Sequence, residues 1–167
     1  MNDVNSQERL QLSFRPERVR LLFVGESPPA GGTYFYLANS DLYRATRSAF
    51  EQARSQWKDT DFLEAFKASG CYLTDLCKMP VNHLETPVRE IARDQAVAAL
   101  SKEIKTCAPE AVIVVMKGIR RQVHAAMNAA GLGATPLFAL PFPGRPKHKE
   151  AFVNGLVEIL KRAHLDQ

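Results

Sequence analysis

Short apolar runs alternate with longer amphipathic segments along most of the chain. Four runs have the length and continuous hydrophobicity of buried strands: residues 20–25, 71–76, 110–116 and 135–140. The segments around them predict helices over residues 40 to about 57, 61–69, 86 to about 106, 118 to about 131 or 133, and about 147–163. Alternation of this kind predicts an α/β fold of three layers, with a four-stranded, mostly parallel central sheet flanked by helices.

Two helix starts are marked by capping residues. Ser40 can cap one helix, and Thr86 can cap another, with Pro87 at its first helical position. Residues 1–17 have no comparable pattern and are the only segment that we expect to be loose. The length of 167 residues, without repeat or linker, fits one domain over residues 1–167.

Composition narrows the class of protein. Hydrophobic residues make up 46% and charged residues 24%, which excludes a disordered chain. The longest apolar run, residues 111–116, is far shorter than the roughly 20 residues of a membrane span, so we expect no membrane partner. Residues 1–9 are polar and lack the apolar centre of a signal peptide, so we expect a cytoplasmic protein.

The net charge and the cysteine content indicate which partners and cofactors the protein can bind. The 22 basic and 18 acidic residues give a net charge of +4, which permits a polyanionic partner without requiring one. Cys71, Cys77 and Cys107 are odd in number and form no C-x-x-C pair. This argues against a disulfide framework, a zinc ribbon or a cysteine-ligated cluster, and we expect no metal and no cofactor.

Ligands of parallel sheets bind at the carboxyl ends of the strands, so the loops after the four predicted strands should share one edge. Glu26 directly follows the first strand, where burial would raise its pKa and suit it to position or deprotonate water. Phe35 lies in an aromatic run that offers a stacking surface for a planar base. The alternatives are that Glu26 caps a turn and that Phe35 belongs to the core.

The other loops carry one carboxylate and several cations. Asp75 lies near the end of the second strand, where it can face a pocket or cap a turn, and Cys77 is better explained as a packed thiol. The cations can bind phosphate or be ordinary surface charge; they are Lys78, Lys117, Arg145, Lys147, His148 and Lys149.

In order and spacing, the four loops together resemble the uracil-DNA glycosylase superfamily, and within it the iron–sulfur branch called family 4. Residues 22–29 (L-F-V-G-E-S-P-P) are similar to its G-E-A-P-G motif, and residues 34–36 fall at its P-F-V-G segment. Residues 74–80 (T-D-L-C-K-M-P) with Asn82 are similar to its T-N-V-V-K-C-R-P-P-x-N-R segment. Residues 108–118 resemble its P-x-V-I-V-x-L-G strand, and 141–146 lie where it has a His-Pro-Ser-Pro-like loop. The resemblance covers about residues 19–163.

The resemblance implies a DNA glycosylase-like enzyme. It would hydrolyse the N-glycosidic bond of uracil, or of another deaminated or damaged base, after the nucleotide flips out of the DNA. Glu26 would be catalytic, by stabilising the sugar cation or activating water. Base-binding residues would be Gly25, Phe35, Asp75 and Phe142, and DNA-binding residues would be Lys78, Lys117, Arg145, Lys147, His148 and Lys149. The partner would be DNA with a damaged base, bound by a monomer.

Three residues or sets depart from the family 4 pattern. The branch holds its cluster with four cysteines, whereas this chain has three in all and Asp94 near one expected ligand position, so no iron–sulfur cluster is expected. Phe142 stands where most members have a histidine that hydrogen-bonds the uracil and stabilises the departing anion. His148 is six residues away and could substitute only if the loop folds back. Asp75 stands where family 4 has a base-reading asparagine; an ionised aspartate only accepts hydrogen bonds, so O4 of uracil would be repelled. Either burial keeps Asp75 protonated or the preferred base differs.

Two alternatives to the enzyme remain open. One is a nucleic-acid-binding relative with little or no glycosylase activity, which the missing histidine favours. The other is a small-molecule or nucleotide hydrolase or binding module on the same sheet, whose mark would be no affinity for DNA even at low salt.

Overall fold

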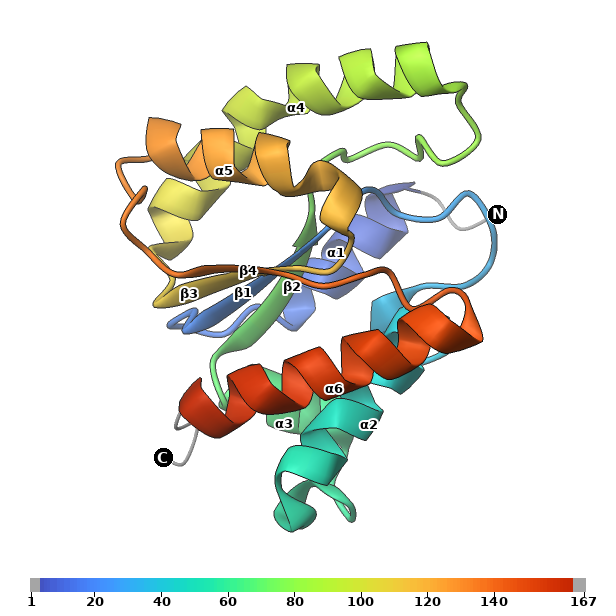
Figure 1. The fold of residues 1–167 in the computed structure, drawn as a ribbon, viewed down its shortest axis with the longest axis vertical. Coiled ribbons are helices and arrows are strands. Elements are labelled where there is room, and N and C mark those ends of the chain that lie inside the picture. Colours follow the sequence, from blue (N-terminus) through green and yellow to red (C-terminus); the bar gives the residue numbers. More distant parts are fainter. Residues whose placement is uncertain (1–3, 164–167) are drawn as a thin grey trace.

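The computed structural model describes residues 4–163 and is built around a four-stranded parallel sheet of order β2-β1-β3-β4 (Figure 1). Its strands are β1 (Leu21–Gly25), β2 (Cys71–Asp75), β3 (Ala111–Val114) and β4 (Leu137–Ala139). Parallel pairing places Gly25 opposite Asp75 at the carboxyl ends of β1 and β2. The predicted α/β fold is confirmed.

Helices cover both faces of the sheet, so the molecule has three layers (Figure 1). In Figure 1, α4 and α5 lie on one face, and α2, α3 and α6 lie on the other. The helices are α1 (Val4–Ser13), α2 (Asp41–Ala53), α3 (Phe62–Ala68), α4 (Thr86–Cys107), α5 (Arg120–Ala129) and α6 (Pro146–Ala163). Short 3-10 helices cover Phe35–Leu37, Ser55–Trp57 and Lys117–Ile119.

Aromatic side chains fill the layer between the sheet and the helices α2 and α3. The ring of Phe23 on β1 lies 5.3 Å from that of Phe66 on α3, and the ring of Phe50 on α2 lies 5.7 Å from Phe66. All three are almost fully buried. Burial of each such side chain stabilises the folded state by roughly 1.5–3 kcal/mol. The packed rings therefore hold β1 firmly against α2 and α3, and so fix the point at which the loop after β1 begins.

The chain departs from the predicted elements near its start and at one helix cap. Residues 1–17, expected to be loose, include α1, whose Gln11 amide donates to the Tyr72 hydroxyl (3.1 Å) and to Thr74 Oγ1 (3.2 Å) on β2. Residues 1–3 lie outside the described part. Ser40 caps α2 by accepting from the Tyr43 N–H at 3.1 Å, as predicted. Thr86 is instead the first residue of α4, with Glu85 at the cap position and no side-chain cap bond.

The Tyr36 hydroxyl substitutes for a missing neighbour strand at the open edge of β2. It donates to the Leu73 carbonyl at 2.7 Å and accepts from the Leu73 N–H at 2.8 Å. Tyr36 is 3% exposed, so these peptide groups are closed off from water. Both groups of Leu73 therefore depend on one side chain.

Replacing Tyr36 with phenylalanine should lower the free energy of unfolding by about 2–4 kcal/mol, because a buried donor and a buried acceptor lose their partner. Urea unfolding would measure the loss. Tyr43→Phe is the control, since the Tyr43 hydroxyl bonds to the Arg47 side chain on the same helix rather than to a buried peptide group, and should cost less than about 1 kcal/mol. Equal losses in the two variants would contradict the edge role of Tyr36.

Candidate functional site

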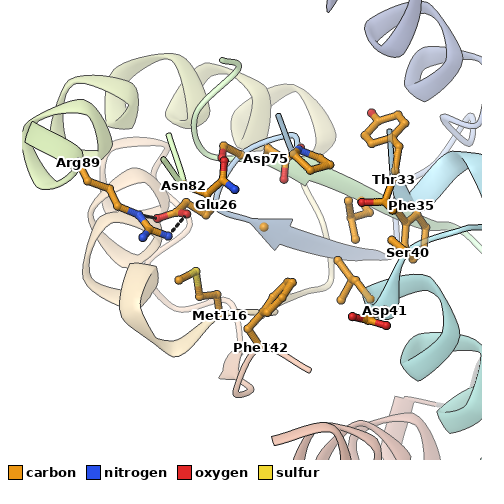
Figure 2. Close-up of a pocket in the computed structure, with 16 residues that line it drawn as sticks. Glu26, Thr33, Phe35, Ser40, Asp41, Asp75, Asn82, Arg89, Met116 and Phe142 are labelled. Atoms are coloured by element: carbon orange, nitrogen blue, oxygen red, sulfur yellow. Dashed lines mark hydrogen bonds and ion pairs between the residues drawn. The ribbon is translucent and has the colours of Figure 1, made fainter. Parts of the chain in front are cut away.

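A pocket of about 330 Å³ opens at the carboxyl ends of the strands (Figure 2). Each strand contributes a residue at or just after its end: Glu26 from β1, Asp75 from β2, Met116 from β3 and Phe142 from β4. In Figure 2, Glu26 with Arg89 lies at one end of the pocket and Phe35 near the other. The lining residues are Gly25, Glu26, Ser27, Pro29, Thr33, Tyr34, Phe35, Ser40, Asp41, Leu42, Leu73, Asp75, Asn82, Arg89, Met116 and Phe142.

The residues predicted to be catalytic or base-binding line the pocket, whereas the cations predicted to bind DNA do not. All five residues predicted to be catalytic or base-binding line it: Gly25, Glu26, Phe35, Asp75 and Phe142. Lys78 lines a neighbouring cavity of about 230 Å³ instead. The remaining cations are exposed and do not line this pocket; they are Lys117, Arg145, Lys147, His148 and Lys149. His148 therefore does not take the place of the missing histidine in this structure.

Glu26 is held between two arginines of α4. Its carboxylate accepts from Arg89 Nε and from Arg93 Nε, each at 2.7 Å, and from an Nη2 of both residues. Glu26 is 8% exposed. Burial raises the pKa of Glu26, but the hydrogen bonds and positive charges of Arg89 and Arg93 outweigh it, so the net pKa is lowered. The expectation of a raised pKa for Glu26 was wrong, because it considered burial without the partners.

A wider network fixes the arginine pair. Arg93 Nη1 also donates to Glu90, and the Gln122 amide of α5 donates to Glu90 and to Asp94 at 3.1 Å. Arg121 pairs with Asp94 at 2.9 Å. Sequence reasoning missed Arg89 and Arg93 as site residues. The one available signal was their spacing of four, which places them on one face of a helix.

Asp75 is the second buried carboxyl of the site, and its environment is the opposite. Its Oδ1 lies 2.6 Å from the point where a Cβ on Gly25 would stand, so any larger residue at position 25 would displace the carboxyl. Neither carboxyl oxygen forms a hydrogen bond with residues 4–163, and Asp75 is 7% exposed. Burial raises the pKa of Asp75 to about 7, with further increases from Glu103 and Glu26 and a partial decrease from Lys78.

Lys78 makes its hydrogen bonds at the end of β2 and to α4, and makes none to the Asp75 carboxyl. Its ammonium donates to Thr74 Oγ1 (3.0 Å), to the backbone carbonyl of Asp75 (2.8 Å) and to Glu103 (2.8 Å). The charge of Lys78 is therefore shared with Glu103. A phosphate would have to compete with that pair.

The two predicted aromatic residues differ in how much surface they offer. Phe35 is 3% exposed and packs edge-on to Tyr36 and Tyr43, so it forms a wall of the pocket and part of the core. Phe142 is 44% exposed. A Cβ on Gly144 would lie 3.2 Å from the Phe142 ring, so the small residue lets the ring fold back over its own loop. Phe142 thus presents the larger accessible ring.

Ser27 connects the first and second loops next to Asn82, which lines the pocket. Ser27 Oγ accepts from the Val81 N–H at 3.2 Å. Asn82 follows directly and lines the pocket, as does Asp75. Its amide can both donate and accept, which the Asp75 carboxylate cannot.

The described residues provide no metal site. Within residues 4–163 there is no group of three or more His, Cys, Asp or Glu side chains able to hold a metal ion. Cys71, Cys77 and Cys107 are free thiols, and burial raises the pKa of all three, which makes them poor nucleophiles. No helix over the same range is long and apolar enough to cross a membrane.

The raised pKa of Asp75 predicts a pH-dependent stability. Folded Asp75 keeps its proton up to about pH 7, whereas an unfolded aspartate loses it near 3.8, so stability falls as pH rises between these values. Asp75→Asn removes this loss and should exceed the wild type by about 2–4 kcal/mol at about pH 8, with little difference near pH 4. Urea unfolding over a pH series measures it, with Asp59→Asn at an exposed position as control. A difference that does not change with pH would contradict the prediction.

Comparison with known families agrees with this geometry. The family model described as Uracil DNA glycosylase superfamily matches residues 12–154, which include every residue that lines the pocket. No curated protein matches the chain. The match spans most of the 167 residues, and the chain belongs to the uracil DNA glycosylase superfamily.

Proposed function

We propose that the protein is a DNA glycosylase that hydrolyses the N-glycosidic bond of uracil, or of another deaminated or damaged base, after base flipping. The observation that carries the proposal is the pocket itself, in which Glu26 and Asp75 stand at the ends of neighbouring strands. Unstacking the nucleotide costs a few kcal/mol, and the pocket's apolar walls and polar groups would offset that cost. Arg145, Lys147 and Lys149, outside the pocket, suit contacts with DNA phosphates.

The base edge would meet Asp75 and Asn82. A neutral Asp75 donates through its hydroxyl and accepts through its carbonyl, which matches the C=O and N–H edge of uracil or hypoxanthine. An ionised Asp75 only accepts, and it matches a base with two neighbouring donors. With a pKa of about 7, both forms of Asp75 are accessible near neutral pH. Phe35 and Phe142 would contact the faces of the base.

Glu26 would act as a fixed negative charge. Its lowered pKa and four donated hydrogen bonds make it a weak base, so the role that fits is stabilisation of the oxocarbenium-like sugar. The bond between C1′ and the base nitrogen breaks, and its electron pair stays with the base. Water then adds to C1′ and loses a proton, and the base nitrogen gains one.

A second candidate function is nucleic-acid binding with little or no base release. It is favoured by the same contacts of Glu26, whose two oxygens are both occupied by guanidinium groups. Phe142 adds to it, because a phenyl ring supplies no proton or hydrogen bond to a departing base.

Base release from oligonucleotides with a single uracil, hypoxanthine or xanthine separates the two candidates. The wild type should release at least one of these bases, and Glu26→Gln should slow release by about 100-fold or more. The matched control is Glu158→Gln, an exposed glutamate that pairs with Lys161 on α6. Thermal melting comes first, because Glu26→Gln leaves the buried Arg93 short of a charge partner, at a cost of about 3–5 kcal/mol. Glu26→Asp, which keeps the charge, serves where the glutamine variant does not fold.

Two outcomes would decide against parts of this proposal. Wild-type protein that binds DNA but releases none of the bases supports the second candidate. Release that Glu26→Gln leaves unchanged excludes Glu26 from the chemistry.

A further inference from the structure

Breaking an N-glycosidic bond in this way leaves negative charge on the base, mainly on its ring nitrogen and the neighbouring carbonyl oxygens. A site that accelerates the reaction must therefore place positive charge or strong hydrogen-bond donors near that base. Glu26 and Asp75 cannot do this as anions, and Phe142 has no donor. Asn82 and a neutral Asp75 can donate hydrogen bonds but carry no positive charge, so a cation that meets the departing base has to come from elsewhere in the pocket.

Arg89 is the one cationic side chain among the described residues that line the pocket. Lys78 and Arg15 line the neighbouring cavity instead. Arg93, one turn further along α4, does not line the pocket. In Figure 2, the guanidinium of Arg89 lies directly beside Glu26 at one end of the pocket.

The two arginines that hold Glu26 differ in their remaining donors. Arg93 uses Nε and Nη2 on Glu26 and Nη1 on Glu90, and its side chain is 9% exposed. Arg89 uses Nε and Nη2 on Glu26, and its Nη1 has no hydrogen-bond partner among residues 4–163. Its side chain is 25% exposed. Arg93 is thus fully engaged by two carboxylates, whereas Arg89 retains donors for a ligand.

We infer that Arg89 donates to the anionic carbonyl oxygen of the departing base and so replaces a catalytic histidine. This inference rests on the proposed glycosylase function. The two-point contact with Glu26 fixes the plane of the Arg89 guanidinium, which reduces the entropy lost on binding. The reaction creates a sugar cation beside a base anion. The Glu26–Arg89 pair complements both, with the carboxylate facing the sugar and the guanidinium facing the base. DNA phosphates have other partners, because Arg145, Lys147 and Lys149 are exposed outside the pocket, whereas Arg89 lines it.

Leaving-group dependence tests the role directly. Single-turnover release is compared for uracil and for 5-fluorouracil, whose anion is intrinsically more stable. Arg89→Gln should slow uracil release by about 100-fold or more. It should slow 5-fluorouracil release clearly less, and Arg89→Lys should restore part of the loss. The charge-matched control is Arg162→Gln at the far end of α6, which should change neither rate. Melting curves confirm that each variant is folded.

A binding measurement keeps the inference separate from the glycosylase proposal. Free 5-nitrouracil is largely an anion at about pH 6, where Asp75 is mostly protonated. Wild type and Arg162→Gln should bind it alike, and Arg89→Gln should bind it about tenfold more weakly or worse. A wild type that binds this anion through Arg89 but releases no base refutes the glycosylase proposal and supports the anion site.

Three results would overturn the role of Arg89. The first is an equal loss of rate for uracil and 5-fluorouracil in Arg89→Gln. The second is unchanged affinity of that folded variant for 5-nitrouracil. The third is weaker binding to undamaged and damaged DNA alike, with the salt dependence reduced by about one phosphate contact, which would assign Arg89 to the DNA backbone.

Discussion

The buried carboxylate of Glu26 is the constraint around which the site is built. A charge that is almost fully removed from water is tolerated only when oppositely charged partners and hydrogen bonds surround it. Arg89 and Arg93 meet that need and thereby fasten the end of β1 to the first turns of α4. Through Arg93 and Glu90 the same network reaches Gln122 on α5. The position of two helices on one face of the sheet is thus coupled to one acidic residue at the pocket.

The neighbouring carboxyl shows what happens without partners. Gly25 and Asp75 are opposite each other in the parallel register, so Glu26 and Asp75 stand at adjacent strand ends. The pKa of Glu26 is lowered by its arginines, and burial raises that of Asp75 to about 7. Two carboxyl groups with oppositely shifted pKa values can hold different protonation states at one pH, which is how carboxyl groups take separate roles in one site. From their positions at strand ends, Glu26 and Asp75 look equivalent in the sequence. The charged groups that surround each carboxyl in the fold make their pKa values differ.

Much of the fold could be predicted because its signals are local. Continuous apolar runs identified the four strands, Ser40 identified a helix start, and parallel pairing followed from the alternation of strands and helices. The helix α1 could not be predicted, since it is polar throughout most of its length and is held in part by Gln11 bonding to β2 rather than by an apolar stripe. The arginine partners of Glu26 are more than 60 residues away in sequence, so their contact depends on the assembled fold. Phe35 was predicted as a stacking surface, yet burial against Tyr36 and Tyr43 leaves it little surface to offer, because core packing decides the exposure of a ring.

The location of the pocket follows from topology before any side chain is considered. The strand order β2-β1-β3-β4 places β1 and β3 side by side, and the connection after β1 runs toward β2 while the connection after β3 runs the opposite way, toward β4. Open parallel sheets bind ligands in the crevice that such a reversal creates at the carboxyl ends. Gly25 and Glu26 stand at that reversal, which is why the loop after β1 meets residues from all three other strands. The scaffold therefore fixes where a ligand binds. The chemistry of that place depends on Asp75 and Phe142, which stand where family 4 has an asparagine and where most members have a histidine, and on the positive charge of the α4 arginines.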